Sequence, residues 1–210
     1  SVKASAASTA FGTQSESIRE LNTELAATLA FSAIQNNDKV GAIFFTDQIE
    51  LFIPARSGRK HILYLIRELL SFDPKSQGTD LNVPLSYLNQ VIKRRCTAFL
   101  ISDFLHWGAD YRTSLSLAAR RHDLVAIRTY DVGAMQLPRL GLVQLQDAES
   151  GRCRWVDTSS RSLREAYEQQ LEAQLGVFHQ NCLRSGVDHI ELAAGRDYTP
   201  ELLRLFGRRS

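Results

Sequence analysis

The stretch Ala98-Phe99-Leu100-Ile101-Ser102-Asp103 sets a short run of strand-forming apolar residues directly before a carboxylate. A run of this kind, without polar alternation, is typical of a strand buried on both faces of a parallel sheet. Two similar runs, VGAIFFT at 40–46 and LVAIRT at 124–129, flank it along the sequence. We expect these three segments to contribute strands to one buried sheet.

Segments with helical periodicity separate these strands. The first helix is expected to begin at Ser17, which forms a capping box with Glu20, and the longest at Ser162, which forms a second box with Glu165. Gly186 is the expected C-terminal cap of that longest helix. Apolar spacing of three and four predicts further helices at 59–71, 82–92, 111–122 and 199–206. Alternating helices and buried strands indicate an α/β fold with a mostly parallel sheet.

Two segments look like hairpins. Strands at 40–46 and 49–53 flank the dipeptide Asp47-Gln48, and strands at 142–145 and 153–156 flank a polar turn. A last short strand is expected at 189–192. The chain shows neither an internal repeat nor a long linker, so we interpret residues 1–210 as a single domain.

Composition excludes several classes of protein. Of the 210 residues, 44% are apolar and 23% are charged, which is ordinary for a globular protein rather than a disordered or disulfide-rich one. The formal net charge of +2 does not favour nucleic-acid binding. No apolar run approaches the roughly 20 residues that span a bilayer. Three widely spaced cysteines are expected to be reduced, structural thiols in a cytoplasmic protein.

Ligands of open parallel sheets bind beyond the carboxyl ends of the strands, which selects three places in this chain. They are the Ala/Ser-rich segment 1–13, the loop 77–80 and the pair Ser102-Asp103. All three offer hydroxyl or carboxylate oxygens, the donors that suit Mg²⁺ and similar divalent cations.

The order of elements resembles a von Willebrand factor type A domain. The local sequence looks more narrowly like a bacterial family of unknown function that is associated with MoxR-type AAA+ ATPases. The matching phrases are FGT at 11–13, LAATLAFSAIQNNDKVGAIFFTD at 25–47, GRKHILYLIRELL at 58–70, GTDL at 78–81, KRRCTAFLISDF at 93–104, RRHDLVAI at 120–127, VDTS at 156–159 and SGVDHIEL at 185–192. The resemblance implies a three-layer, Rossmann-like, mostly parallel sheet flanked by helices, with an added β-hairpin.

The same resemblance implies a metal-ion-dependent adhesion site, for which Ser8, Thr79 and Asp103 match expected ligands. Ala4 and Ala6 stand where the family pattern has an aspartate and a serine, so we expect a degenerate site that binds Mg²⁺ weakly or is empty. The buried strand that precedes this motif in the family is expected to be missing or truncated, since only residues 1–3 come before it.

Simpler interpretations of these residues stay open. Thr79 and Asp80 can serve only as a loop and helix-capping pair, and Asp103 can be a turn former. Ser8 can be filler in an Ala/Ser run. The five histidines are scattered, and we expect them on the surface or on helix faces. They are His61, His106, His122, His179 and His189.

Two functions follow. The first is a non-enzymatic protein-interaction module that recognises acidic side chains, for which the resemblance implies a MoxR-type AAA+ ATPase or its client as partner and a chaperone-like role in assembly. The alternative is a metal-dependent hydrolase that uses Asp103 and Asp80. The sequence contains no nucleophile elbow, P-loop or HExxH motif, which favours the first function.

Overall fold

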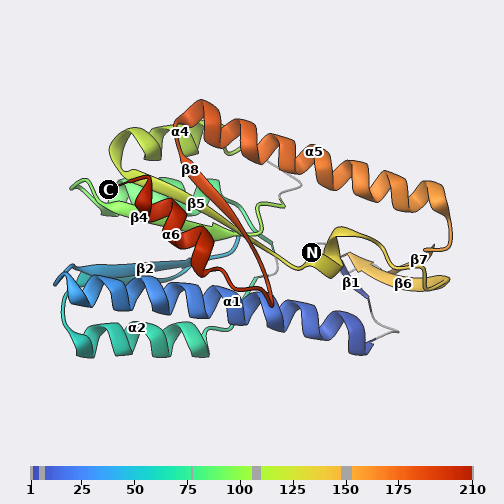
Figure 1. Cartoon of the computed structure of the whole chain (residues 1–210), viewed down its shortest axis with the longest axis horizontal. Helices are drawn as coiled ribbons and strands as arrows, with labels where there is room; N and C mark the ends of the chain where they lie inside the picture. The colour runs from blue at the N-terminus through green and yellow to red at the C-terminus, as the bar shows by residue number, and fades with distance from the viewer. Residues whose placement is uncertain (1, 5–7, 77, 106–109, 148–152, 210) are drawn as a thin grey trace.

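A parallel three-stranded sheet lies at the centre of the computed structural model, with helices on both of its faces (Figure 1). The structure describes residues 2–4, 8–76, 78–105, 110–147 and 153–209. The sheet has the order β4-β5-β8. Its strands are β4 (Thr97–Ser102), β5 (Asp123–Tyr130) and β8 (Asp188–Ala193). The predicted α/β class is therefore confirmed.

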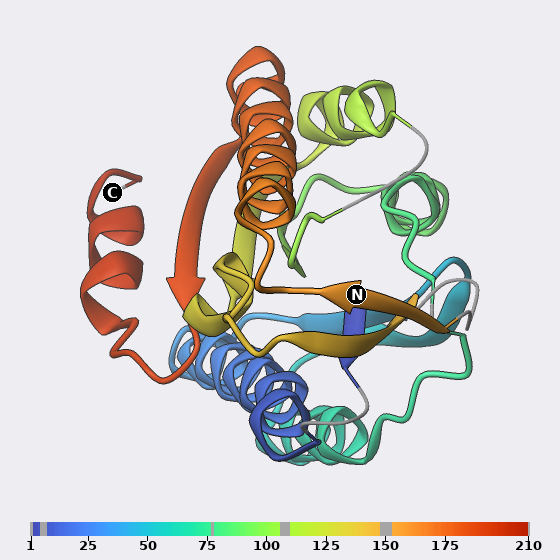
Figure 2. The same cartoon turned by 90° about the vertical axis from the view of Figure 1, so that its right-hand side faces the viewer.

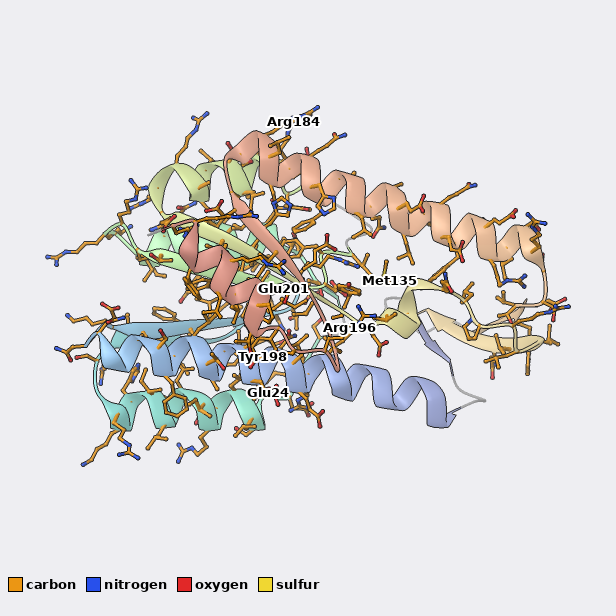
Figure 3. The ribbon with its side chains drawn as sticks, in the orientation of Figure 1. Glu24, Met135, Arg184, Arg196, Tyr198 and Glu201 are labelled. Atoms are coloured by element: carbon orange, nitrogen blue, oxygen red, sulfur yellow. The ribbon has the colours of Figure 1, made fainter. Side chains whose placement is uncertain are left out.

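Alternation of side chains along β5 builds the two core layers. Val125 and Ile127 pack on one face with α1 (Ser8–Gln35) and α6 (Thr199–Gly207). Leu124 and Ala126 point to the other face, where three helices cover the sheet. These are α3 (Asn82–Val91), α4 (Arg112–Arg121) and α5 (Arg161–Ser185). On the first face, the Tyr198 hydroxyl lies 3.3 Å from Oγ1 of Thr28, which joins the start of α6 to α1 (Figure 3).

The apolar run at 40–46 forms a strand, as expected. It does not join the central parallel sheet, which corrects the expectation of one sheet. β2 (Val40–Phe45) pairs antiparallel with β3 (Ile49–Arg56) in a two-stranded sheet, as the predicted hairpin requires. A Cβ at Gly41 would lie 2.7 Å from the Ile53 carbonyl oxygen, so the two strands approach closely there. The helix α2 (Arg59–Ser71), which has the predicted bounds, covers the hairpin.

A third sheet is antiparallel and has the order β1-β6-β7 (Figure 2). The predicted hairpin is present as β6 (Leu142–Asp147) and β7 (Cys153–Asp157). β1 (Val2–Ala4) pairs with β6, with Ala4 opposite Leu145. The segment before the expected metal motif thus forms a strand of this outer sheet, apart from the central one. The 3₁₀ turn η1 (Val132–Met135) lies between β5 and β6 in the chain.

Two helix starts differ from the capping boxes in the sequence. α1 begins at Ser8, nine residues before Ser17, and α5 begins at Arg161 with Ser160 as its cap. The Ser160 hydroxyl accepts the Leu163 N–H, so the cap lies two residues before the predicted Ser162. The predicted C-terminal cap of α5 is confirmed, since Gly186 has the left-handed φ of 64°.

In the described part of the chain, no helix combines the length and apolar character that a membrane crossing requires. Cys96 and Cys182 are free thiols. Within the same residues, β2 and β4 are each the last strand of their sheet.

Candidate functional site

Asp103 follows β4 directly, at the carboxyl end of the central sheet, as the sequence predicts. Its Oδ1 accepts the Leu105 N–H at 3.1 Å and lies 3.5 Å from the Ser102 hydroxyl. That hydroxyl in turn accepts the Phe104 N–H at 3.3 Å. The pair Ser102-Asp103 therefore closes a tight turn at the end of the strand, which is the turn-forming role that the sequence left open.

The turn is held in an uncommon backbone conformation. Phe104 has a φ of 53°, which few residues other than glycine adopt. Its side chain is only 3% exposed and its ring centroid lies 4.5 Å from that of Phe178 on α5. Burial of the ring thus offsets the cost of the backbone and fixes the direction in which the chain leaves Asp103.

Burial also raises the pKa of the Asp103 carboxyl above its usual range. The Leu105 N–H and the positive charge of Arg128 act in the opposite direction and offset only part of the effect. A carboxyl of this kind gives up its proton less readily than an exposed one. A cation that binds Asp103 has to compete with that proton.

Residues 78–80 of the predicted loop 77–80 lie within the described structure and are anchored to the end of β2, whereas Gln77 lies outside it. The Asp80 N–H donates to the Thr46 carbonyl oxygen at 3.1 Å. The Asp80 carboxylate accepts both the backbone N–H and the side-chain amide of Asn82, at 2.9 and 3.1 Å. Asp80 therefore accepts the first N–H of α3 from the position before the cap, and Thr79 is exposed to solvent. The cap position itself is Leu81, which makes no side-chain capping hydrogen bond, so the capping interpretation of Asp80 is supported only in this local sense.

The N-terminal candidates fall on different elements. Ala4 ends β1, and Ser8 is the first residue of α1. Ala6 lies outside the described residues. In the described ranges, no hydrogen bond joins Thr79 or Asp80 to Asp103, and no three or more His, Cys, Asp or Glu residues gather in a way that could hold a metal ion.

A buried ion-pair network that was not predicted from the sequence lies beside Asp103. Arg128 on β5 is 1% exposed, and its Nη1 lies 2.6 Å from Oε2 of Glu191 on β8. Its Nε donates to the Asp103 carbonyl oxygen at 3.2 Å. The other oxygen of Glu191 lies 2.8 Å from Nε2 of His179 on α5. The network therefore joins all three strands of the central sheet to α5.

The Arg128 guanidinium also makes a contact with an aromatic ring and a contact with a sulfur atom. Its central carbon lies 4.6 Å from the centroid of the Tyr130 ring, a cation–π geometry. Its Nη2 lies 3.6 Å from the sulfur of Met135, at the end of η1 (Figure 3). Hydrogen bonds from His179 and Arg128 lower the pKa of Glu191, although burial acts to raise it. Glu191 is thus held ionised beside the buried guanidinium.

One local signal for this network exists in the sequence. Arg128 interrupts the apolar run at 124–129, and a charged residue in a buried strand is rarely left without a partner. The histidines also differ from the expectation in part. His122 is 1% exposed at the C-terminal end of α4, and the rings of His179 and His189 lie 5.2 Å apart. His106 lies outside the described residues.

Comparison with known proteins finds relatives and a shared fold. The family model described as "Protein of unknown function DUF58" matches residues 2–176. Uncharacterized proteins Mb1516 of Mycobacterium bovis and Rv1480 of Mycobacterium tuberculosis are each 29% identical over 205 residues, which is 97% of this chain and 64% of the relative. Uncharacterized protein MAV169 of Mycobacterium avium is 30% identical over 159 residues, which is 75% of this chain and 93% of that protein. The chain thus spans about two thirds of the two longer relatives.

Two solved structures share the fold at low sequence identity. The conserved hypothetical protein BatB from Bacteroides thetaiotaomicron superposes with a TM-score of 0.57 at 14% identity, over 90% of this chain and 87% of that one. An aerotolerance-related membrane protein from Bacteroides fragilis gives a TM-score of 0.55 at 15% identity, over 90% and 86%. These likenesses concern the arrangement of the elements alone.

Proposed function

The chain belongs to the DUF58 family of proteins of unknown function, and we propose that it acts as a non-enzymatic protein-interaction module. The proposed architecture is that of a von Willebrand factor type A-like domain. Helices on both faces of a parallel sheet, and a carboxylate at the carboxyl end of β4, support this assignment. Such a carboxyl end is where ligands of open α/β sheets bind.

The observation that carries the proposal is the position and state of Asp103. Its carboxyl is held by the Leu105 N–H at the end of the sheet, and burial raises its pKa. It is the only carboxylate among the three proposed metal ligands, the others being the hydroxyls of Ser8 and Thr79. Mg²⁺ is usually held by one or two carboxylates and several waters. This set has one carboxylate, and its raised pKa makes a cation compete with a proton, so we propose a degenerate metal site.

The proposed partner is a MoxR-type AAA+ ATPase or its client, and the proposed role is that of an accessory in the assembly of a protein complex. This part of the proposal extends the resemblance of the motifs quoted above. The proposed compartment is the cytoplasm, and the free thiols of Cys96 and Cys182 support it, since cytoplasmic cysteines are usually reduced.

Metal titration tests the site. We expect Mg²⁺, Mn²⁺ and Ca²⁺ at millimolar concentration to leave the melting temperature of the chain unchanged. The double variant Ala4→Asp/Ala6→Ser should regain a metal-dependent rise, because an ion at roughly 100 times its Kd stabilises a protein by about 2.7 kcal/mol. A repaired variant that ignores all three ions would refute the assignment of Ser8, Thr79 and Asp103.

Affinity capture tests the partner. The tagged chain should retain an AAA+ ATPase of the MoxR type from an extract of the native host, and Asp103→Asn should weaken that retention. Glu165→Gln is a matched control, because it removes one carboxylate charge at an exposed position of α5. Recovery of no AAA+ ATPase, or equal retention by Asp103→Asn and the control, would contradict the proposal.

A further inference from the structure

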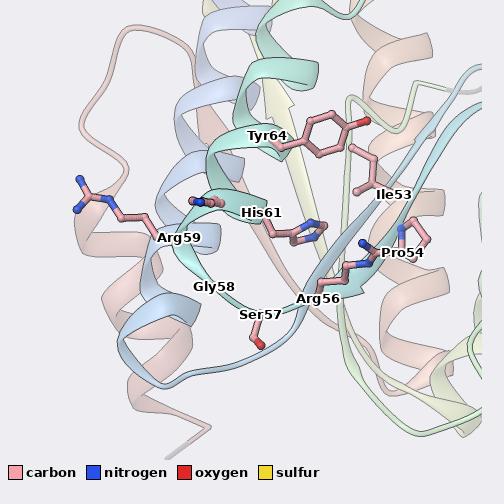
Figure 4. Close-up of a pocket in the computed structure, with 9 residues that line it drawn as sticks. Ile53, Pro54, Arg56, Ser57, Gly58, Arg59, His61 and Tyr64 are labelled. Carbon is pink, nitrogen blue, oxygen red and sulfur yellow. The ribbon is translucent and has the colours of Figure 1, made fainter.

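A pocket of about 770 Å³ lies between the end of β3 and the start of α2 (Figure 4). Its polar lining comes from Arg56, Ser57, Arg59, Lys60, His61 and Tyr64, and we call it the basic pocket. Its apolar lining comes from the last part of β3. The basic pocket shares no residue with the Asp103 turn or with the loop at 77–80.

The positive charge of the basic pocket is not neutralised by the protein. No acidic residue lines it. Arg56, Arg59 and Lys60 are exposed, and none of them forms an ion pair in the part of the chain that the structure describes. The first turn of α2 also contains no acidic residue. Three cations beside the positive end of a helix repel one another, so an anionic group that binds among them is favoured.

The aromatic rings of His61 and Tyr64 also line the basic pocket. His61 Nε2 donates to the Val40 carbonyl oxygen at 2.9 Å, which ties the imidazole to β2. Tyr64 is 41% exposed, and the Arg67 guanidinium lies 5.4 Å from the centroid of its ring. Figure 4 shows the side chains of His61 and Tyr64 pointing from α2 towards Ile53 and Pro54. Arg56 lies beside this aromatic and aliphatic surface, whereas Arg59 extends from the other side of the start of α2 (Figure 4).

The apolar character continues along the outer face of α2. Leu63 and Leu70 are 49% and 62% exposed, and Arg67 lies between them at the spacing of one helix face. Arginine, tyrosine and large apolar residues are enriched where proteins bury surface against partners, and they include most binding hot spots. A small anion would use only the charges, whereas a protein segment would also cover this apolar face.

We propose that the basic pocket and the outer face of α2 together dock a segment of a partner protein in which carboxylates lie beside apolar side chains. The carboxylates pair with Arg56, Arg59 and Lys60, and the apolar side chains cover Tyr64 and Leu63. This proposal rests on the proposed function only in taking the occupant to be a protein. It supplies a docking surface that needs neither Asp103 nor a metal ion.

The experiment measures the affinity of the whole chain for a fluorescent peptide of repeated Glu-Leu-Leu-Glu units, by anisotropy in the presence of EDTA. Arg56→Gln/Arg59→Gln/Lys60→Gln should weaken binding at least tenfold, and Tyr64→Ala should weaken it severalfold. The control is Lys93→Gln/Arg94→Gln/Arg95→Gln, which removes three exposed cations at another site and should change the affinity less than twofold. Free inorganic phosphate at 10 mM, about the strength of a common buffer, should not displace the peptide.

Three results would overturn the proposal. They are an affinity equal in the pocket variant and the wild type, an equal loss in the control variant, and full displacement by phosphate, which would indicate a site for small anions. Glu165→Gln, which removes one exposed carboxylate of α5, should bind the peptide like the wild type in this assay. Failure of the docking surface is therefore distinguishable from failure of the proposed metal site, because EDTA removes any contribution of a divalent ion.

Discussion

At the scale of single residues, the pairing of Arg128 with Glu191 places a buried charge in the central sheet. The guanidinium is almost fully buried, whereas the Glu191 side chain is 31% exposed. Removing one partner of such a pair leaves the other charge without compensation, which costs more than the pair itself contributes. The network should therefore respond strongly to single substitutions.

Glu191→Gln should lower the free energy of unfolding at pH 7 by about 2 kcal/mol, because it leaves the buried Arg128 without a countercharge. Urea denaturation measures this difference. The pKa of Glu191 is lowered in the folded protein, so its contribution is complete above the unfolded pKa and is lost as pH falls through the folded pKa. The gap between variant and wild type should persist from pH 7 to about 5 and shrink below about pH 4.

The exposed pair of Arg161 and Glu165 provides the contrast. Its side chains are 85% and 51% exposed, so Glu165→Gln should change the free energy of unfolding by less than about 0.5 kcal/mol. Equal losses in the two variants would show that burial of Arg128 does not set the strength of its ion pair.

Asp103→Asn should leave the free energy of unfolding at pH 7 at or above that of the wild type, by up to about 1 kcal/mol. The amide oxygen can still accept the Leu105 N–H, and the cost of burying a negative charge is removed. The raised pKa favours the protonated carboxyl in the folded protein, so the gap should persist above that pKa and close as pH falls through it towards the unfolded pKa of about 4. Asp103→Ala loses the hydrogen bond and should be less stable than the wild type by about 1 kcal/mol.

Asp103 could be found from the sequence and the Arg128 network could not, for a physical reason. Asp103 adjoins its strand in the chain, so a local pattern is enough to place it at the end of a sheet. Arg128 and Glu191 are 63 residues apart and meet only because β5 and β8 pair in one register. Such a contact depends on which strands become neighbours, and local spacing carries no information about that choice.

At the scale of elements, Gly176 within α5 and Gly186 directly after it have different backbone environments. Gly186 ends the helix with a φ of 64°, whereas Gly176 lies within it, and a Cβ at either position meets no atom within 4 Å. Substitution by alanine therefore changes backbone preference without creating a clash. The two alanine variants therefore measure how backbone conformation at each position contributes to the free energy of unfolding.

Gly186→Ala should lower the free energy of unfolding by about 1 kcal/mol, because the left-handed conformation is costly for a residue with a Cβ. Gly176→Ala should raise it by about 0.5–1 kcal/mol, since alanine favours the helix interior. Thermal denaturation of both variants measures these changes. Melting temperatures shifted in the same direction would contradict the assignment of the cap.

The starts of the helices were harder to predict than their existence. The outward face of α2 follows from spacing, and its bounds of Arg59–Ser71 match the sequence pattern. The box of Ser17 and Glu20 is a local signal that lies inside α1, where the helix continues backwards to Ser8. A capping sequence shows where a helix can begin, and the preceding residues decide whether it does.

At the scale of the whole molecule, the alternation of elements predicted the class but not the division into sheets. The expected single parallel sheet is confirmed for β4, β5 and β8. β2–β3 and β1-β6-β7 form separate antiparallel sheets. An apolar run shows that a strand is buried, but hydrogen-bond partners are chosen by the topology of the whole chain.

Among the residues that the structure describes, β2 and β4 each lie at the end of a sheet, which has a practical consequence for the purified protein. A strand at the rim of a sheet offers its free N–H and C=O groups as a template for a further strand from another molecule. Concentrated solutions should therefore form larger species over days, with a rate that rises with protein concentration, and dynamic light scattering would follow this growth. Aggregation of this kind would begin from the folded molecule, so conditions that stabilise the fold would not prevent it.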